Sequence, residues 1–335
     1  MILANTTSYT ANPYFDNNFF EFFGTLASRI FAFISGAHLQ LAADELQILV
    51  LALIAISASV VGTFLVLRKM TMLTNALSHT ILTGVVFAYL FYDLMKSGQR
   101  FDGADLHFST LLPDEKLLLG AALFMAFLTT FLTQFLVTKM KLKEDASCGL
   151  VFTFLFAVGV IVVTLLSRNA HVGAELLMGN ADVLHSDDLA FQFKVTLVNL
   201  ALIFVLYRAY FVTTFDPIFS HVLGISSLFF GYLLMGQAAI TSIAAFRAVG
   251  VLLVLAFFVG PPLIVRLWTC RLKPLLMLSF CVGTFVALLG VALSRHLLSY
   301  YALPVSTSAL IVSLIALIYC GALILKSFVV NTKRF

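Results

Sequence analysis

Charge is scarce in this sequence. Asp, Glu, Lys and Arg make up 11% of its 335 residues, whereas 61% of the residues are hydrophobic. A soluble domain carries about 25% charged residues, so this composition excludes an ordinary cytosolic enzyme. It also excludes a disordered chain and a nucleic-acid-binding protein, because both require charge rather than apolar surface.

Paired cysteines and familiar catalytic motifs are missing as well. The four cysteines stand singly, without a Cys-x-x-Cys pair, which argues against a disulfide framework and a thiolate metal site. No Gly-Lys dipeptide occurs, so there is no G-x-x-x-x-G-K-S/T loop for ATP phosphates. Neither H-E-x-x-H nor G-x-S-x-G occurs. We therefore expect no cofactor site and no catalytic residue in this chain.

Long apolar runs are what the sequence does have. A helix needs about 20 apolar residues to cross about 30 Å of hydrocarbon. The sequence therefore predicts an all-α, polytopic membrane protein with about nine (8–10) transmembrane helices. The expected spans are residues 46–67, 75–95, 117–138, 148–167, 190–212, 224–244, 247–267, 273–294 and 304–326.

The amino-terminal part differs from the rest of the chain. Residues 19–38 hold six phenylalanines with one acidic and one basic residue, which is typical of an interfacial amphipathic helix. An additional span at this position stays open. We expect residues 1–45 to form an N-terminal segment, 46–326 a single transmembrane domain and 327–335 a tail.

Basic residues orient the expected spans. Their clusters at 68–69, 139–143 and 271–273 fall on the same side when the loops alternate. By the positive-inside rule this side is cytoplasmic, so the C-terminus is inside as well. The opposite side carries the acid-rich loops 96–116 and 168–189, which are either solvated connections or a surface for a cation or a partner protein.

The second expected span carries a polar stripe. Asn75 and His79 lie one helical turn apart, so their side chains can converge on one ion. Imidazole and amide oxygens are ligands for divalent metals, and a polar stripe in hydrocarbon must face the bundle interior or a water-filled path. Hydrogen bonding between helices is the alternative interpretation. The stripe consists of Thr71, Thr74, Asn75, Ser78, His79 and Thr83.

A short helix is predicted on the cytoplasmic side between two spans. Asp216 and Pro217 form a preferred helix start, and Gly224 is a preferred helix end. Exposed Phe219 and Val222 would give a soluble partner an apolar surface, although a plain connection is the alternative. Farther along, the apolar run 247–262 ends in Gly-Pro-Pro, which predicts a kink or an end of the helix.

These stretches resemble the permease subunit of the metal-type ABC importers, the family that takes up manganese, zinc and iron. Residues 62–79 are similar to its "Gly-x-x-x-Val-x-Arg-Arg-Met … Asp-Ala-Leu-Ser-His" signature. Residues 215–224 are similar to "Phe-Asp-Pro-x-Phe-Ala-x-x-Leu-Gly", and residues 248–262 to "Ala-Val-Gly-x-Leu-Leu-Val … Pro". In order and spacing the match covers roughly residues 40–326.

The resemblance implies a type II ABC importer-like permease in a bacterial inner membrane, without enzymatic activity of its own. Two permease subunits, identical or different, would form a central path for the metal, which is substrate rather than cofactor. Cytoplasmic ATP-binding subunits would drive transport, and an extracytoplasmic metal-binding protein would deliver the ion. Asn75 and His79 occupy the positions of the family's intramembrane metal site. The coupling helix that contacts the ATPase would comprise Phe215, Asp216, Pro217, Phe219, Leu223 and Gly224.

The sequence departs from the family pattern at the metal site. The family's aspartate is Asn75 here, and its alanine and proline are Thr80 and Thr83. Loss of the carboxylate removes a full negative charge from a site for a divalent cation. The site is then weaker, or a second permease of different sequence supplies the missing carboxylate, or the position is only a passage.

Two other functions place polar residues inside a membrane. A secondary cation transporter driven by an ion gradient is the main alternative, but such carriers often contain inverted repeats and none is visible. An intramembrane enzyme has only Ser78 and His79 in its favour, and neighbouring residues on a helix point about 100° apart. The sequence leaves the choice among manganese, zinc and iron open.

Overall fold

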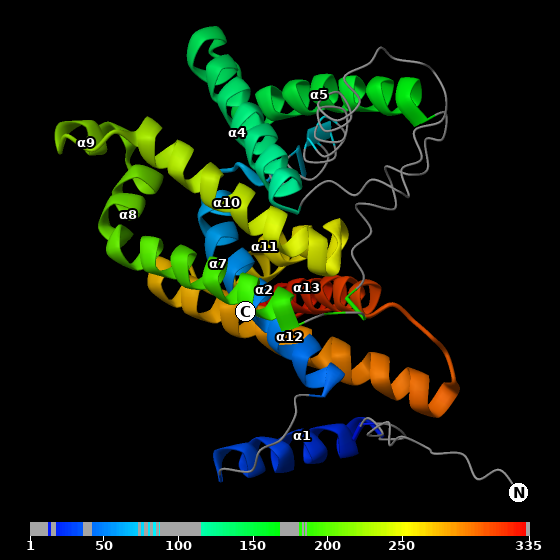
Figure 1. Ribbon diagram of the computed structural model, residues 1–335. Coiled ribbons are helices and arrows are strands. Elements are labelled where there is room, and N and C mark those ends of the chain that lie inside the picture. The colour runs from blue at the N-terminus through cyan, green and yellow to red at the C-terminus, as the bar shows by residue number, and fades with distance from the viewer. Residues whose placement is uncertain are drawn as a thin grey trace, which may run out of the picture.

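The computed structural model describes residues 13–14, 18–35, 42–72, 75–76, 80, 83–84, 87, 115–167, 181–182, 184 and 186–332. Over these residues every regular element is a helix (Figure 1). Seven of the helices contain a stretch that is long and apolar enough to cross a membrane. They are α2 (Ala43–Leu67), α4 (Glu115–Met140), α5 (Glu144–Ser167), α7 (Ser186–Val205), α10 (Ser227–Val249), α12 (Leu272–Tyr301) and α13 (Thr307–Thr332).

These helices confirm the predicted all-α membrane fold. Two of the nine expected spans are not among the seven. The expected span 75–95 lies mostly outside the described residues. The expected span 247–267 is formed by the end of α10 and by α11 (Val251–Arg266), whose 16 residues are shorter than a complete crossing.

Helix α2 forms the centre of the bundle. It packs against α12, α11, α7 and α10, and most of its length is buried. Small residues allow the closest contacts, as they do between membrane helices in general. A Cβ atom added to Gly62 would lie 2.0 Å from the carbonyl oxygen of Phe258 on α11, and one added to Gly283 on α12 would lie 2.8 Å from Ser59 Oγ. The bundle therefore depends on glycine at these crossings.

The break between α10 and α11 lies at Gly250, not at the Gly-Pro-Pro sequence. Gly250 has a φ of 85°, which favours glycine, and α11 continues through Pro261 and Pro262 to Arg266. The two prolines have no N–H to donate to the carbonyls of Phe257 and Phe258. The Ser59 hydroxyl of α2 donates to the Phe257 oxygen at 3.4 Å. In isolation Pro261 and Pro262 would favour the end of a helix. Packing against α2 accommodates them inside α11.

A buried polar junction joins three of the spans. The amide of Asn199 on α7 donates to Ser57 Oγ on α2 at 2.9 Å and to Thr241 Oγ1 on α10 at 2.7 Å. All three residues are buried. Because hydrocarbon offers no alternative partners for these groups, the junction fixes how the three helices face one another.

Helix α1 (Phe19–Ile34) lies against the amino-terminal end of α2 and the carboxy-terminal end of α12 (Figure 1, blue, at the bottom). Its Arg29 guanidinium forms a two-bonded ion pair with Glu45, which raises the pKa of Arg29. The Tyr14 hydroxyl also donates to Glu45, at 2.9 Å. The ring of Phe19 contacts His296 of α12. These contacts attach the N-terminal segment to the bundle.

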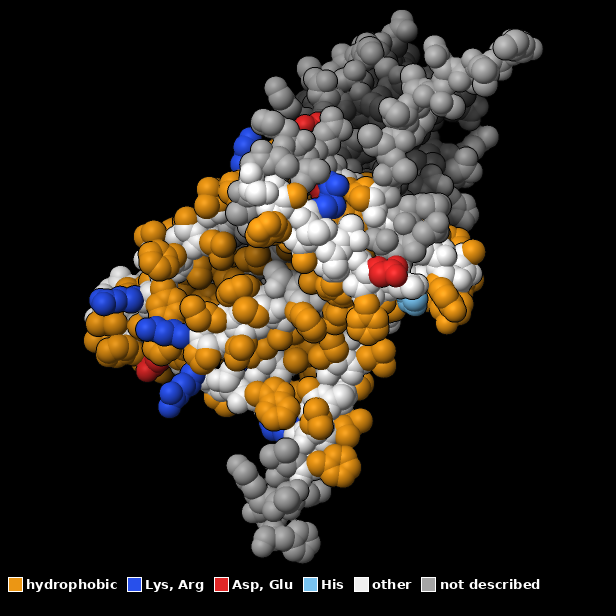
Figure 2. Space-filling view, turned by 90° about the horizontal axis from the view of Figure 1, so that it is seen from below, with side chains coloured by type: hydrophobic (Ala, Val, Ile, Leu, Met, Phe, Trp, Pro, Cys, Tyr) orange, Lys and Arg blue, Asp and Glu red, His pale blue; other side chains and the backbone are white. Residues whose placement is uncertain are grey.

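The opposite end of the bundle carries two short helices. Helix α8 (Tyr207–Phe215) continues α7 after Leu206, and α9 (Pro217–Val222) follows it before α10 begins. Figure 1 shows α9 projecting where α8 and α10 meet. Figure 2 shows a broad hydrophobic surface with several Lys and Arg side chains at its left end and others near its upper border. This pattern suits a membrane band bordered by a basic side.

Candidate metal path and ATPase docking helix

Asn75 borders a cavity of about 1260 Å³ between the helices. The cavity is bounded by the start of α2, the α10–α11 break at Gly250, the end of α12 and the first half of α13. The Asn75 side chain is half-buried there. His79, the second predicted ligand, lies outside the described residues, as does Ser78.

Two threonines that follow Asn75 in the chain, Thr80 and the stripe member Thr83, have structural partners. The Thr80 hydroxyl donates to the Ala76 carbonyl oxygen at 3.0 Å, and the Thr83 hydroxyl donates to Leu155 O on α5 at 3.1 Å. Both threonines are buried. A Cβ atom on Gly84 would lie 2.9 Å from the Ala121 oxygen on α4. The stripe is therefore divided: Thr83 hydrogen-bonds to a neighbouring helix, whereas Asn75 borders the cavity.

Polar side chains gather at one end of the cavity. Asp44 of α2 forms an ion pair with Arg295 of α12. Asp182 accepts hydrogen bonds from Gln47 Nε2 at 3.1 Å and from the Thr307 hydroxyl. We call this group of side chains, Asp44, Gln47, Asp182, Arg295 and Thr307, the polar mouth, because it gathers ionisable and neutral polar groups at one end of the cavity.

Sequence reasoning missed most of this polar mouth. Asp182 belongs to an acid-rich loop that was expected to be either solvated or a cation or partner surface. Asp44 and Arg295 lie 251 positions apart in the chain, so only the fold brings them together. One signal in the sequence could have pointed to it. Ionisable residues next to apolar runs are costly to place in hydrocarbon unless they are paired, so their presence there indicates partners.

The described residues contain no group of three or more His, Cys, Asp or Glu side chains that could hold a metal ion. An amide oxygen such as that of Asn75 is a type of group that suits hard divalent ions better than soft ones.

The predicted short helix is present as α9. The Asp216 carboxylate accepts a hydrogen bond from the Phe219 backbone N–H at 2.9 Å, and Pro217 occupies the first helical position. At the other end Ile225 N donates to Ser220 O at 2.8 Å, and Gly224 has a φ of 75°. Leu223 is the C-terminal cap residue. The local sequence signals therefore position both ends of this helix.

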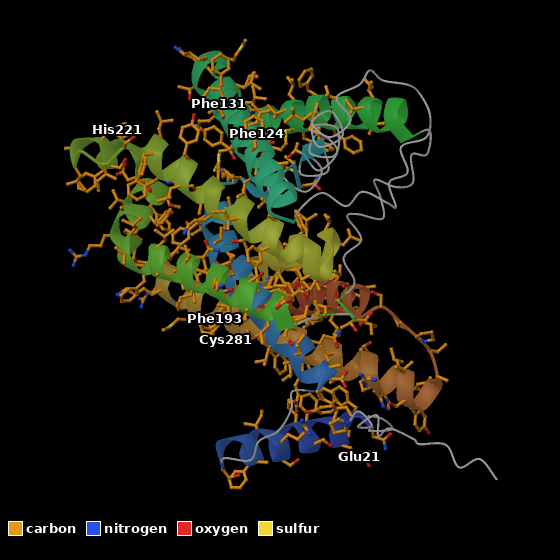
Figure 3. All side chains as sticks on the ribbon, viewed as in Figure 1. Glu21, Phe124, Phe131, Phe193, His221 and Cys281 are labelled. Carbon is orange, nitrogen blue, oxygen red and sulfur yellow. The ribbon has the colours of Figure 1, made fainter. Side chains whose placement is uncertain are left out.

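Helix α9 exposes an apolar surface. Ile218 is 81% exposed and Val222 is 78% exposed. Phe219 and Leu223 are each about half exposed, as is Phe215 at the end of α8. Ile218 was not among the residues predicted for this surface. Figure 3 shows His221 of α9 at the edge of the molecule, so this helix is accessible to another protein.

The sequence of the chain matches one protein family over most of its length. The profile of the ABC 3 transport family matches residues 44–326. The chain belongs to this family. Its membership confirms the resemblance that the three sequence motifs indicated, and it agrees with the seven candidate membrane spans of the described residues.

Two bacterial proteins illustrate the relationship. A Chlamydia muridarum protein, described as "Probable metal transport system membrane protein", is 38% identical over 316 residues, which cover 93% of this chain and 94% of that protein. The Bacillus subtilis "Manganese transport system membrane protein MntD" is 36% identical over 251 residues, which cover 71% of this chain and 79% of that protein.

A solved structure is similar along nearly the whole chain. It is PsaBC from Streptococcus pneumoniae in complex with Fab, which superposes with a TM-score of 0.64 at 22% sequence identity. The likeness covers 89% of this chain and 95% of that chain. The all-helical fold is thus that of an ABC permease, as the sequence predicted.

Proposed function

We propose that this chain is the membrane permease subunit of an ATP-driven importer that moves a divalent transition metal into the cytoplasm. The observation that carries the proposal is the cavity that runs from a polar mouth to Asn75 within a bundle of the ABC 3 family. The metal is the transported substrate. The relatives' descriptions favour manganese as the first ion to test, with zinc and iron beside it.

The metal enters the cavity at the polar mouth and passes Asn75 and His79. The Asn75 oxygen and the His79 imidazole replace part of the hydration shell of the cation. With an amide in place of a carboxylate the ion is held weakly, so it can leave again. A second permease subunit, either a copy of this chain or a different one, completes the path and supplies further ligands.

Helix α9 docks the ATP-binding subunits, which hydrolyse ATP outside this chain. Its exposed apolar residues lie on the side of the bundle that carries the basic clusters, so this side and the C-terminus are cytoplasmic. The polar mouth is then extracytoplasmic, where a metal-binding protein delivers the ion. The protein belongs in a bacterial inner membrane, with residues 46–326 as the permease domain and 327–335 as a cytoplasmic tail.

Within the N-terminal segment, residues 1–45, helix α1 lies on the extracytoplasmic side of the membrane. Phe20 and Phe31 of α1 are 83% and 74% exposed, and such side chains suit the boundary between headgroups and acyl chains. Since Arg29 holds α1 to the start of α2, this helix lies beside the polar mouth.

The proposal is tested by reconstituting the complete transporter into lipid vesicles and measuring uptake of Mn²⁺, Zn²⁺ and Fe²⁺. We expect uptake of at least one of these ions that requires ATP hydrolysis and continues after ionophores have abolished all ion gradients. Uptake that follows an ion gradient without ATP would identify a secondary transporter instead. Purification of the chain without any ATP-binding subunit would also contradict the proposal.

A further inference from the structure

Arg68 stands at the cytoplasmic end of α2, at a fixed turn in the chain. Lys69 adopts a left-handed conformation with a φ of 61°, and Met70 N donates to Leu65 O at 2.9 Å. Lys69 N donates to Val66 O at 3.3 Å. This pair of bonds is the usual closure of a helix that ends in a left-handed residue. The backbone around Arg68 is therefore defined.

The guanidinium of Arg68 bridges to α8. Its Nη2 donates to Thr213 Oγ1 at 2.8 Å, and its Nε donates to Thr214 Oγ1 at 3.3 Å. The Thr213 hydroxyl donates in turn to Ala209 O at 2.8 Å, so its oxygen is oriented to accept from Arg68. The planar guanidinium group carries several N–H donors in a fixed geometry, which suits contacts to two hydroxyls. A lysine ammonium group would not reproduce this geometry.

Arg68 also lies against the beginning of α10. Its Nη1 is 3.4 Å from the position that a Cβ atom on Gly231 would take. Nearby, the Tyr210 hydroxyl of α8 donates to Gln237 Oε1 of α10 at 2.6 Å, and the Tyr210 ring contacts Phe64 of α2 with 5.3 Å between centroids. Helix α8 is thus bound to the end of α2 and to α10.

This bridge connects the two candidate functional regions. On one side Thr213 and Thr214 lie three and two positions before Asp216, whose carboxylate caps α9. On the other side Arg68 is seven positions before Asn75, which borders the cavity. The Arg68 side chain therefore links the end of α8, next to α9, to the part of the chain that leads to Asn75.

We propose that Arg68 is a positioning residue that transmits the movement of α9 to α2 and to the segment bearing Asn75, so that ATP hydrolysis is coupled to metal passage. This inference rests on the proposed function of α9 as the ATPase docking helix. Coupling between distant sites requires an element that responds to both, and the Arg68 bridge is such an element.

The test uses the complete transporter in lipid vesicles and measures the number of metal ions taken up per ATP hydrolysed. We expect Arg68→Gln and Thr213→Val to retain the ATP-binding subunits and to hydrolyse ATP, but to lower this ratio at least about fivefold. The double variant should have the same ratio of metal ions to ATP as Arg68→Gln alone, because both changes remove the same bridge.

Two matched controls separate coupling from charge and from folding. Lys69→Asn removes the neighbouring positive charge with a residue that tolerates the left-handed conformation, and its ratio should equal that of the wild type. Thr213→Ser keeps the hydroxyl that accepts from Arg68, so it should restore the ratio that Thr213→Val loses.

The inference is overturned if Arg68→Gln and Thr213→Val transport with the wild-type ratio. It is also overturned if their uptake falls only in proportion to the amount of assembled transporter. If Arg68→Gln fails to assemble, Thr213→Val decides the result alone. A wild-type transporter without ATP-driven uptake would refute the proposed function itself, whereas a transporting wild type with unaffected variants would refute only the coupling role.

Discussion

At the scale of single residues, Asn75 is the side chain on which the transport proposal depends. It borders the cavity, and the nearby Thr80 and Thr83 are hydrogen-bonded to backbone oxygens. A carboxylate about 4 Å from a unit positive charge would contribute about 4 kcal/mol at an effective dielectric constant of about 20. An amide oxygen contributes much less, so we interpret Asn75 as a ligand that favours release over retention.

Asn75→Asp should therefore bind the metal more tightly. We expect the purified transporter to retain Mn²⁺ at least about tenfold longer than the wild type, which corresponds to about 1.4 kcal/mol. Uptake should become slower because release is delayed. Asn75→Leu is the control of similar volume without an oxygen ligand, and it should retain less metal than the wild type. Equal retention by all three proteins would show that Asn75 does not contact the ion.

At the scale of helices, α2 and α11 are fitted to each other by small residues and by prolines. Pro261 and Pro262 leave the carbonyls of Phe257 and Phe258 without their usual helical donors. Ser59 donates to the first of these oxygens, and the absence of a side chain on Gly62 makes room for the second. This pairing gives the Phe257 oxygen a donor and leaves space for the Phe258 oxygen in a proline-containing helix.

Gly62→Ala should consequently destabilise the bundle. The new methyl group would overlap the Phe258 oxygen, so α2 and α11 must separate, at a cost of about 1–3 kcal/mol. Thermal unfolding of the purified protein in detergent measures the effect.

Gly236→Ala provides the comparison for this measurement. Gly236 lies within α10, and a Cβ atom there would have no atom within 4 Å. Alanine is favoured over glycine in a helix by about 0.5–1 kcal/mol, so this variant should be at least as stable as the wild type. Equal stability of Gly62→Ala and Gly236→Ala would contradict the packing described for α2.

Local signals explain which helices could be predicted from the sequence. Long apolar runs identified the membrane spans, and Asp216-Pro217 with Gly224 identified α9, because capping depends on a few adjacent residues. The sequence predicted a helix break at Pro261 and Pro262, but the break lies at Gly250. This difference could not be predicted, because it depends on packing against α2, which is distant in the sequence.

At the scale of the whole molecule, the polar mouth and α9 lie at opposite ends of a largely apolar bundle. The cavity begins at the mouth, where Asp44, Arg295 and Asp182 meet, and extends along α11 and α13. The sequence predicted Asn75 from helical spacing, but not the mouth. Its residues come from separate helices and become neighbours only after the chain has folded.

The central claim is that the metal passes through this cavity, and a bulky side chain in the cavity tests it most directly. Ala316 of α13 lines the cavity, whereas the adjacent Leu317 is 67% exposed and is not part of its lining. We expect Ala316→Trp to abolish ATP-dependent metal uptake by the reconstituted transporter while the ATP-binding subunits remain attached. Leu317→Trp should transport like the wild type. Undiminished uptake by Ala316→Trp would contradict the account.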